Sequence, residues 1–315
     1  MPDSNHPAMP AAPAVSVVIP IVNAAPYLPA LLDRLAAQQP APPAEIILVD
    51  SGSTDDSRAI ASSRANVRIV PIENFSHGRA RNLGIQAAGG DIIVLLTQDA
   101  LPRDNQWLAA LLAPLADPAV AAVFSRQAPR PDAPPTEQFF LNYHFPPGAP
   151  RRWQADAQTA PAFGRTVFFS NVSAAIRRSC LPAHPFDETL IMSEDQQLAR
   201  DLLAAGHAIV YQPASVVAHS HRYSLSLAFR RYFDSVYSLT QIFPEHDMQA
   251  SASLGLRYLR QETWFIIRRH PWYLPYYILY TMAKTAGTIA GHYAGRMPRK
   301  LARFCSLHRY HWDTP

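Results

Sequence analysis

Two acidic residues follow apolar segments that are typical of buried strands. Residues 92–96 are continuously apolar and are followed by Asp99, and residues 45–50 end in Asp50. An unbroken apolar run predicts a strand of a parallel sheet covered by helices on both faces. Ligands bind at the carboxyl edge of such a sheet, where Asp99 could hold a divalent cation and, through it, a phosphate. The alternative is that Asp99 caps the turn that follows it.

A second group of polar residues lies in the later half of the chain. Glu194 and Asp195 precede a helix expected at residues 196–205, with Gly206 as its C-terminal cap. Acidic residues also suit the dipole of a helix start, so the pair alone does not establish a site. His219 and His221, at i and i+2 of an extended chain, point the same way. Because imidazole is a common metal ligand, His219 is the first candidate for a ligand and His221 the second.

The segments between these residues predict alternating strands and helices. Strands are expected at 15–20, 45–50, 67–70 and 92–96, with helices at 26–39 and 78–88 between them. Such βαβ units predict an α/β fold in which helices flank a doubly wound, mostly parallel sheet. Pro102 is expected to end strand pairing after the fourth strand. Further on we expect a helix at 107–115, a loop at 129–135, and strands at 119–124, 166–170, 209–212 and 215–218.

Composition narrows the classes of protein that remain. The chain has 315 residues, which suits one large domain or two smaller ones. With 48% hydrophobic and 17% charged residues, wholesale disorder is not expected. The net charge of +4 suits an acidic or phosphate-bearing partner. Two cysteines are too few for a disulfide framework and favour a reducing cytosol.

The ends of the chain lack the patterns of membrane insertion. Residues 1–13, rich in Pro and Ala, are expected to be a disordered lead-in and have no signal-peptide pattern. No run of about 20 uncharged apolar residues predicts a membrane-spanning helix.

Four blocks of sequence, in their order and spacing, resemble those of family 2 glycosyltransferases. The blocks are Val-Ser-Val-Val-Ile-Pro at 15–20, Glu-Ile-Ile-Leu-Val-Asp-Ser-Gly-Ser-Thr-Asp-Asp at 45–56, Gly-Arg-Ala-Arg-Asn-Leu-Gly at 78–84 and Leu-Leu-Thr-Gln-Asp-Ala at 95–100. That family has the GT-A fold and uses nucleotide-sugar donors. Its usual acidic motif is Asp-Xaa-Asp, whereas Thr97-Gln98-Asp99 lacks the first acid, which leaves Asp99 as the expected metal ligand.

The resemblance implies a role for each candidate residue. Asp195 would be the catalytic base, Glu194 would support the acceptor site, and Asp99 and His219 would hold Mg²⁺ or Mn²⁺ at the departing diphosphate. On the donor side, the nucleotide pocket would be lined by Pro20 and Asn23, the nucleobase contacted by Asp50, and the donor bordered by Arg81 and Asn82.

Further stretches resemble the rhamnosyltransferase-like branch of the family. They are Thr-Gln-Asp-Ala at 97–100, Arg-Gln at 126–127, Ser-Asn-Val at 170–172, Met-Ser-Glu-Asp at 192–195, His-Ser-His-Arg-Tyr-Ser at 219–224 and Leu-His-Arg-Tyr-His-Trp at 307–312. Ser125-Arg126-Gln127, expected just after a strand, also resembles a motif of that branch. The resemblance implies inverting transfer of a sugar, with dTDP-L-rhamnose as the favoured donor, to a surface-polysaccharide or lipid-linked glycan acceptor.

Other functions remain open at this point. They are transfer from a UDP- or GDP-linked sugar, nucleotide-sugar binding without catalysis, and nucleotidyl transfer. A nucleotidyltransferase would need a Gly-rich loop with Lys or Arg after the first strand, which residues 21–25 lack. A non-catalytic binding protein would not need Asp195. No nucleic-acid partner is expected.

The sequence divides into a GT-A domain at 14–222 and a helical, aromatic-rich extension at 223–315. Helices are expected at 225–242, 251–269 and 272–293, followed by a basic cluster that consists of Arg296, Arg299, Lys300 and Arg303. Aromatic residues beside a basic cluster fit a helix in a membrane interface, and equally an aromatic subdomain packed on the sheet. The expected location is therefore the cytoplasm, with or without contact at the inner face of its membrane. Residues 136–163 are interpreted as an insertion over the active site.

Overall fold

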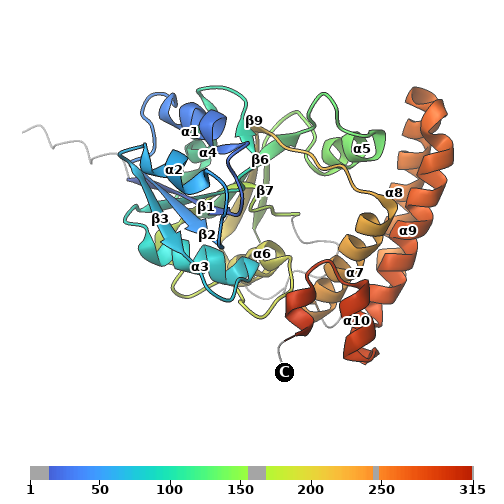
Figure 1. The fold of residues 1–315 in the computed structure, drawn as a ribbon. Helices are drawn as coiled ribbons and strands as arrows, with labels where there is room; N and C mark the ends of the chain where they lie inside the picture. The colour runs from blue at the N-terminus through green and yellow to red at the C-terminus, as the bar shows by residue number, and fades with distance from the viewer. Residues whose placement is uncertain (1–13, 155–167, 244–247, 314–315) are drawn as a thin grey trace, which may run out of the picture.

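The computed structural model describes residues 14–154, 168–243 and 248–313 of the chain (Figure 1). Its centre is a nine-stranded sheet with the order β3-β2-β1-β4-β8-β6-β9-β5, and β7 pairs with β9. The strands are β1 Val15–Ile21, β2 Glu45–Asp50, β3 Val67–Pro71, β4 Ile92–Leu96, β5 Leu101–Pro102, β6 Val120–Ala128, β7 Arg151–Gln154, β8 Ser173–Arg177 and β9 Ala208–Ala218. The predicted lead-in at 1–13 lies outside the described residues.

Helices cover both faces of the sheet and form a separate group after β9 (Figure 1). Those before β9 are α1 Leu28–Ala36, α2 Ser57–Ser62, α3 His77–Ala87, α4 Trp107–Leu112, α5 Pro135–His144 and α6 Glu194–Ala204. Those after it are α7 Leu225–Ile242, α8 Met248–Arg269, α9 Leu274–His292 and α10 Arg299–Cys305, and a short 3₁₀ helix follows at Arg309–Trp312.

The sheet is mostly parallel, as the sequence predicts, but it also contains antiparallel strands. Strands β3, β2, β1 and β4 are parallel, but β8 runs antiparallel to both of its neighbours, β4 and β6. Strand β8 therefore begins at the edge where β4 ends, and the amide of Thr97 donates to the carbonyl of Val172 there. This reversal brings the residues just before β8 to the same edge as Asp99.

Several predicted boundaries were wrong for identifiable reasons. Pro102 pairs with Val217 of β9. This is possible because proline lacks only an amide donor. The next amide, on Arg103, donates to the carbonyl of Val216. Residues 125–127 lie inside β6, since pairing with β9 resumes after a register shift. The two predicted closing strands are one strand, β9. Helix α4 ends at Leu112 and continues as a 3₁₀ turn, Ala113–Ala116.

Two further predictions, at residues 136–163 and 166–170, fall partly outside the described residues. Residue 135 begins α5 rather than ending a loop, and Phe139 of this helix contacts Tyr258 and Phe265 of α8. Residues 168–170 are not in a strand, and the rest of the strand predicted at 166–170 lies outside the described residues. The interpretation of 136–163 as an insertion over the site stays a prediction, because residues 155–163 lie outside the described part of the chain.

The Gly-Arg-Ala-Arg-Asn-Leu-Gly block has a packing explanation. A Cβ at Gly84 would lie 2.3 Å from a methyl group of Val18, so glycine lets α3 approach the sheet closely. A Cβ at Gly78 would lie 2.4 Å from the carbonyl oxygen of Asp187, in the loop before α6. The two glycines therefore hold α3, and with it Arg81, between the sheet and that loop.

The C-terminal helices pack around α7. Gly287 and Gly291 of α9 lie against the backbone of Phe229 and Phe233, where a Cβ would clash. Helices α8 and α9 are joined by a buried ion pair in which Lys284 Nζ lies 2.8 Å from a carboxylate oxygen of Glu262. Among the described helices, none combines the length and the apolar character needed to cross a bilayer.

Candidate active site

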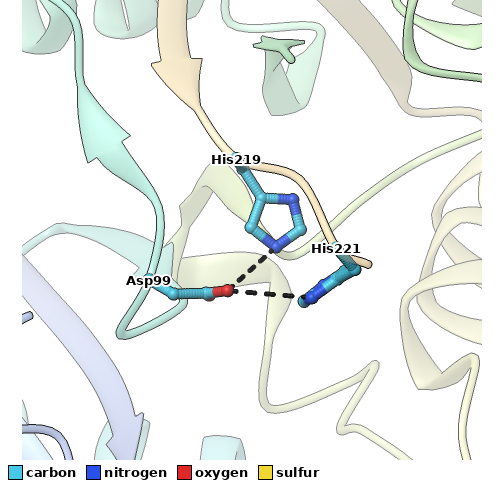
Figure 2. A group of neighbouring side chains, drawn as sticks. All are labelled: Asp99, His219 and His221. Carbon is cyan, nitrogen blue, oxygen red and sulfur yellow. Dashed lines mark ion pairs between the residues drawn. The ribbon is translucent and has the colours of Figure 1, made fainter. Parts of the chain in front are cut away.

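Asp99, His219 and His221 converge at the carboxyl edge of the sheet (Figure 2). Asp99 follows β4, and the two histidines follow β9. Asp99 Oδ2 lies 3.5 Å from His219 Nε2 and 4.0 Å from His221 Nδ1. The three ligand atoms lie within 4.8 Å of one another. One carboxylate and two imidazoles form a reasonable ligand set for a divalent metal ion.

The hydrogen bonds around His219 assign its tautomer. Gln127 Nε2 donates to Ser170 Oγ at 2.9 Å, so Gln127 Oε1 is left to accept from His219 Nδ1 at 3.0 Å. The lone pair on Nε2 then faces Asp99. Burial lowers the pKa of His219 to about 3 despite the nearby Asp99 carboxylate, so the ring is neutral. Two acceptors that face each other without a proton between them fit a cation.

A cavity of about 240 Å³ adjoins these residues. Arg130 lines it and donates from its guanidinium to the backbone carbonyl of Asp99. The cavity also borders Tyr27, Asp132, His221 and Arg222. The charges of its two arginines are matched by those of Asp99 and Asp132, and Arg222 Nη2 lies 3.8 Å from Asp132 Oδ2.

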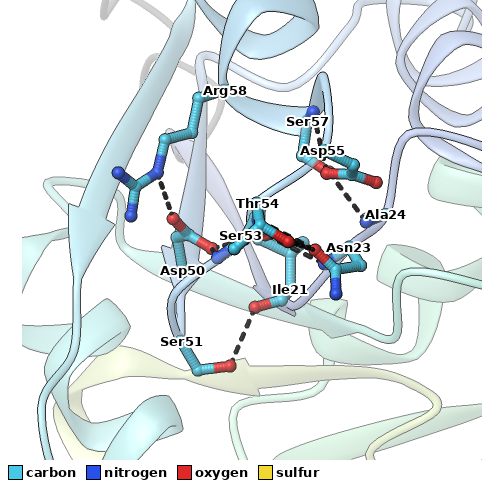
Figure 3. Close-up of polar contacts among 10 residues, drawn as sticks. All are labelled: Ile21, Asn23, Ala24, Asp50, Ser51, Ser53, Thr54, Asp55, Ser57 and Arg58. Carbon is cyan, nitrogen blue, oxygen red and sulfur yellow. Dashed lines mark hydrogen bonds and ion pairs between the residues drawn. The ribbon is translucent and has the colours of Figure 1, made fainter.

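Asp50 lies in a network that links the ends of β1 and β2 (Figure 3). It is buried, and its Oδ1 accepts from the amide and the hydroxyl of Ser53 at 2.9 and 2.6 Å. Arg58 Nε donates to Oδ2 at 2.6 Å. Burial alone would raise the pKa of Asp50, but these hydrogen bonds and the charge of Arg58 bring it below the usual value. The carboxylate is therefore ionised and fixed at the strand end.

Asn23 connects this network to the loop after β1. Its backbone is left-handed, with φ 46°, a conformation that asparagine tolerates. Its Oδ1 accepts from the amide of Thr54 at 2.9 Å. Gln98, in the position between the two acids of the usual motif, exchanges hydrogen bonds with the backbone of Val22. Pro20 lies in β1 opposite Val49, so the predicted donor residues Pro20, Asn23 and Asp50 share one edge.

Glu194 and Asp195 begin α6, and their two carboxyl groups have different surroundings. Glu194 is buried and lies 2.8 Å from Arg81 Nη1, which keeps its pKa low against the effect of burial. Ser193, just before it, is left-handed with φ 64°. Non-glycine residues held in this region cost free energy and gather at functional sites.

Asp195 is the group whose pKa is raised. Burial is the largest cause and the negative charge of Glu194 the second, and together they raise the pKa of Asp195 to about 7 although Arg81 opposes them. The amide of Asn171 donates to Oδ2 at 3.3 Å. Asp195 keeps some exposure to solvent. A reacting group can therefore reach its carboxyl group. A carboxyl group with this pKa can take up a proton near neutral pH.

Comparison with known proteins identifies the family. The model of the family described as glycosyl transferase family 2 matches residues 16–181, more than half of the chain. The chain belongs to glycosyl transferase family 2. This transferase is 32% identical over 305 residues to the O-antigen chain rhamnosyltransferase RfbN of Salmonella typhimurium, a match that covers 95% of this chain and 96% of that one. It is 31% identical to the O-antigen chain rhamnosyltransferase WbaN of Salmonella anatum, with 96% of each chain covered.

Solved structures confirm the GT-A fold of this family 2 glycosyltransferase. The mannosyltransferase PcManGT from Pyrobaculum calidifontis, in complex with GDP-Man and Mn²⁺, superposes with a TM-score of 0.55 at 21% identity over 96% of this chain and 85% of that one. The glucosyl-3-phosphoglycerate synthase of Mycobacterium tuberculosis gives a TM-score of 0.54 at 20% identity over 76% of this chain and 82% of that one. At these identities the likeness concerns the fold alone.

Two residues predicted to border the donor have other partners in the transferase. Both ends of the Asn82 amide bond the loop before α6: Nδ2 donates to the Phe186 carbonyl and to Glu188, and Oδ1 accepts from the Phe186 amide. Arg81 pairs with Glu194 and donates to the carbonyl of His77. A donor contact by either residue stays a prediction.

Sequence reasoning missed the contribution of residues 306–312 to the transferase site. The ring of His308 lies 4.9 Å from that of His77, and Tyr310 lies 6.1 Å from Phe75, at the start of the helix that carries Arg81. The charge of Glu194 is among the influences on the pKa values of both His308 and Tyr310. The only signal was the likeness of Leu-His-Arg-Tyr-His-Trp to the family branch.

Arg231 of α7 was also missed. Its guanidinium carbon lies 5.4 Å from the centre of the Tyr223 ring, and that ring lies 5.3 Å from His221. Burial is the main cause that lowers the pKa values of His219, His221 and His308, and the positive charge of Arg231 lowers them further. In the described part of the chain no carboxylate pairs with Arg231. Nothing in the local sequence distinguishes it from Arg230.

Proposed function

We propose that this glycosyltransferase moves an L-rhamnosyl unit from dTDP-L-rhamnose to a lipid-linked surface-polysaccharide chain at the inner face of the cytoplasmic membrane, with inversion at the sugar. The observation that carries the proposal is its similarity to two O-antigen chain rhamnosyltransferases over 95% and 96% of its length. The similarity extends beyond residue 181, where the general family match ends, and through the C-terminal helices.

In this proposal Asp195 is the general base. It accepts the proton of the acceptor hydroxyl as that oxygen attacks the anomeric carbon of the donor. The raised pKa of Asp195, about 7, makes the carboxylate a stronger base than an ordinary aspartate while leaving it partly ionised at neutral pH. Glu194, paired with Arg81, contributes the negative charge that raises this pKa and does not itself take the proton.

Asp99, His219 and His221 fit a Mg²⁺ or Mn²⁺ ion, because the Asp99 carboxylate faces a neutral imidazole lone pair. When bound, such an ion neutralises the diphosphate that leaves with the nucleotide. Arg231 supplies further positive charge from α7, and Arg130 does so from the cavity wall. Asp50, Asn23 and Pro20 bind the nucleoside at the neighbouring edge of the sheet.

The test is a donor panel with purified, full-length protein and Mn²⁺. Release of nucleoside diphosphate is measured from dTDP-L-rhamnose, UDP-glucose and GDP-mannose, and Asp195→Asn serves as the inactive control. We expect turnover of dTDP-L-rhamnose to exceed that of the other donors by at least about tenfold, about 1.4 kcal/mol of discrimination.

Two results would contradict the proposal. Preferred turnover of a UDP- or GDP-linked sugar would make the protein a transferase of a different donor. Tight binding of a nucleotide sugar with no turnover in the presence of a cell-envelope lipid extract would indicate a binding protein. The configuration of the released or transferred sugar, read by NMR, tests inversion separately.

A further inference from the structure

Helix α9 exposes a face without charge. Along its outer side the exposed residues recur at helical spacing, and they are apolar, small or aromatic. Met282 is 63% exposed and Ile289 57% exposed, values typical of polar surface residues. The exposed residues of α9 are Pro275, Ile278, Leu279, Met282, Thr285, Ala286, Thr288 and Ile289, and the exposed Tyr293 follows the end of the helix.

The inner face of α9 explains why these side chains cannot turn inward. Gly287 and Gly291 lie against the α7 backbone, and a Cβ at either position would come within 2.4 Å of a carbonyl oxygen. Tyr277 and Tyr280 fill the rest of the buried side, and Lys284 reaches Glu262 from it. The rotation of the helix is therefore fixed, and its larger apolar side chains must face outward.

Exposed large apolar side chains also occur on the other C-terminal helices. Of the sixteen large apolar side chains that are exposed in the described part of the chain, thirteen lie at residues 254–310. Trp264 is 56% exposed on α8, Trp272 is 72% exposed at the turn before α9, and Phe304 is 68% exposed on α10. Single exposed apolar residues are ordinary, but a concentration of this size marks an interaction surface.

The charges around this surface identify its partner. Exposed basic residues flank it, and Arg268 lies over the Trp264 ring at 4.1 Å. They include Arg257, Arg260, Arg268, Arg269, Arg296 and Lys300. Over the described residues 248–313 the acids are Glu262, buried against Lys284, and Asp313, paired with Arg303. A second copy would oppose the same basic rim to itself, because a two-fold contact uses one patch twice.

We propose that the outer face of α8 and α9 lies on a membrane surface that carries anionic headgroups. The apolar face of α9 enters the boundary between headgroups and acyl chains, Trp264 and Trp272 lie at headgroup level, and the arginines contact lipid phosphates. The inference extends the proposed function by naming the surface that brings the enzyme to a lipid-linked acceptor. Because α7 packs beneath α9 and carries Arg231, the membrane face is one helix away from the site.

The experiment is flotation of the full-length protein with phosphatidylcholine vesicles, with and without phosphatidylglycerol. The protein is expected to float with the anionic vesicles at low salt and to be released at about 0.5 M salt, where screening is strong. Neither donor nor acceptor sugar is needed. Failure of dTDP-L-rhamnose turnover would therefore leave this inference standing, and failure of flotation would leave the donor assignment standing.

Variants separate the apolar and basic contributions. Met282→Glu with Ile289→Glu should reduce partitioning at least about tenfold for each substitution, because each removes a buried apolar side chain and adds a charge. Arg268→Glu with Arg269→Glu should reduce it about fivefold for each positive charge removed. Arg103→Glu, at an exposed position on the sheet side of the molecule, is the matched control and should float normally. Circular dichroism and binding of dTDP verify that each variant is folded.

Three results would overturn the inference. They are no flotation with anionic vesicles at low salt, equal flotation with neutral and anionic vesicles, and unchanged flotation of the Met282→Glu, Ile289→Glu variant. A dimer in sedimentation velocity that this variant dissociates, together with no flotation of the wild type, would assign the face to a second copy instead.

Discussion

Asp195 and Glu194 are adjacent in sequence, yet their environments push their pKa values in opposite directions. Arg81 keeps Glu194 ionised, whereas burial and the Glu194 charge favour the protonated form of Asp195. Divergent pKa values in a pair of acids identify which of them exchanges protons. In the proposed mechanism Glu194 therefore holds the charge and Asp195 accepts the proton.

The first prediction is that Asp195→Asn lowers turnover by at least about a hundredfold, because an amide cannot accept the proton. The substitution is nearly isosteric, so binding of dTDP should change by less than about twofold. Turnover is measured by nucleotide release and binding by calorimetry. Turnover close to that of the wild type would remove Asp195 from the mechanism.

The second prediction concerns pH. The base acts in its deprotonated form, so kcat should rise as pH increases through about 7 and then level off. Glu194→Gln removes a negative charge that raises the pKa of Asp195 and leaves Arg81 unpaired. Both changes should move the rise to lower pH. A pH profile that is the same in wild type and Glu194→Gln would contradict this assignment.

The third prediction concerns the metal site. EDTA should abolish transfer, and Mg²⁺ or Mn²⁺ should restore it. Asp99→Ala should weaken binding of Mn²⁺ in the presence of dTDP, measured by electron paramagnetic resonance. Gln127→Ala, which frees the ring of His219, should weaken it about 10–100-fold, the usual cost of losing a residue that orients a ligand. Full activity in EDTA would instead assign the diphosphate charge to Arg130 and Arg231.

At the scale of elements, Asp234 of α7 ties the segment 306–312 to the rest of the molecule. Its Oδ2 accepts from the amides of Leu307 and His308, each at 2.9 Å, and it is fully buried. The pKa of Asp234 is raised by burial, yet these amides and the nearby arginine stabilise the charged form. One side chain thus positions the segment whose His308 ring lies against His77.

The fourth prediction is that Asp234→Ala destabilises the protein by about 1–3 kcal/mol, the cost of leaving buried amides unpaired. The loss should appear first as cleavage near residue 306 in limited proteolysis, with reduced turnover. Arg103→Ala, at an exposed position, is the control. Normal turnover in Asp234→Ala with a released segment would show that residues 306–312 are not needed for catalysis.

The sequence predicted several strands and helices well because each has a strong local signal. The apolar run at 92–96 corresponds to β4 without error, and 225–242 corresponds to α7. The antiparallel β8 could not be predicted, since strand direction depends on which neighbours a strand meets. The bridge at Pro102 was missed for the same reason: its partner lies more than a hundred residues away.

In the candidate site, too, local sequence signals predicted some residues, whereas others depend on long-range strand pairing. Asp50, Asp99, Asp195 and His219 lie at strand or helix ends, where local patterns suggest function. Asn171 contacts Asp195 only because β8 reverses, a contact that depends on long-range pairing.

At the scale of the whole molecule, the α/β part and the C-terminal helices are joined by many contacts. The hydroxyl of Ser238 in α7 bonds the carbonyl of Met192, and Arg200 of α6 bonds the carbonyl of Ile242 at 2.5 Å. The amide of His221 donates to Glu137 of α5, which in turn packs on α8. These contacts couple the predicted domains at 14–222 and 223–315.

The fifth prediction is therefore a single thermal transition in calorimetry for the full chain, with equal calorimetric and van't Hoff enthalpies. Addition of dTDP and Mn²⁺ should shift the whole transition upward, because ligand binding stabilises the folded state by mass action. Two separated transitions, of which only one responds to nucleotide, would indicate that the boundary near residue 222 divides independent folding units.

The position of His308 against His77 also affects when the enzyme becomes competent during synthesis. Chains emerge from the ribosome at about 5–20 residues per second, and their N-terminal parts fold first. Pro20, Asn23, Asp50 and Asp99 emerge early, whereas His219 and His221 and then His308 would follow many seconds later. In the proposed mechanism, competence for sugar transfer would therefore arise only when nearly the whole chain has been synthesised.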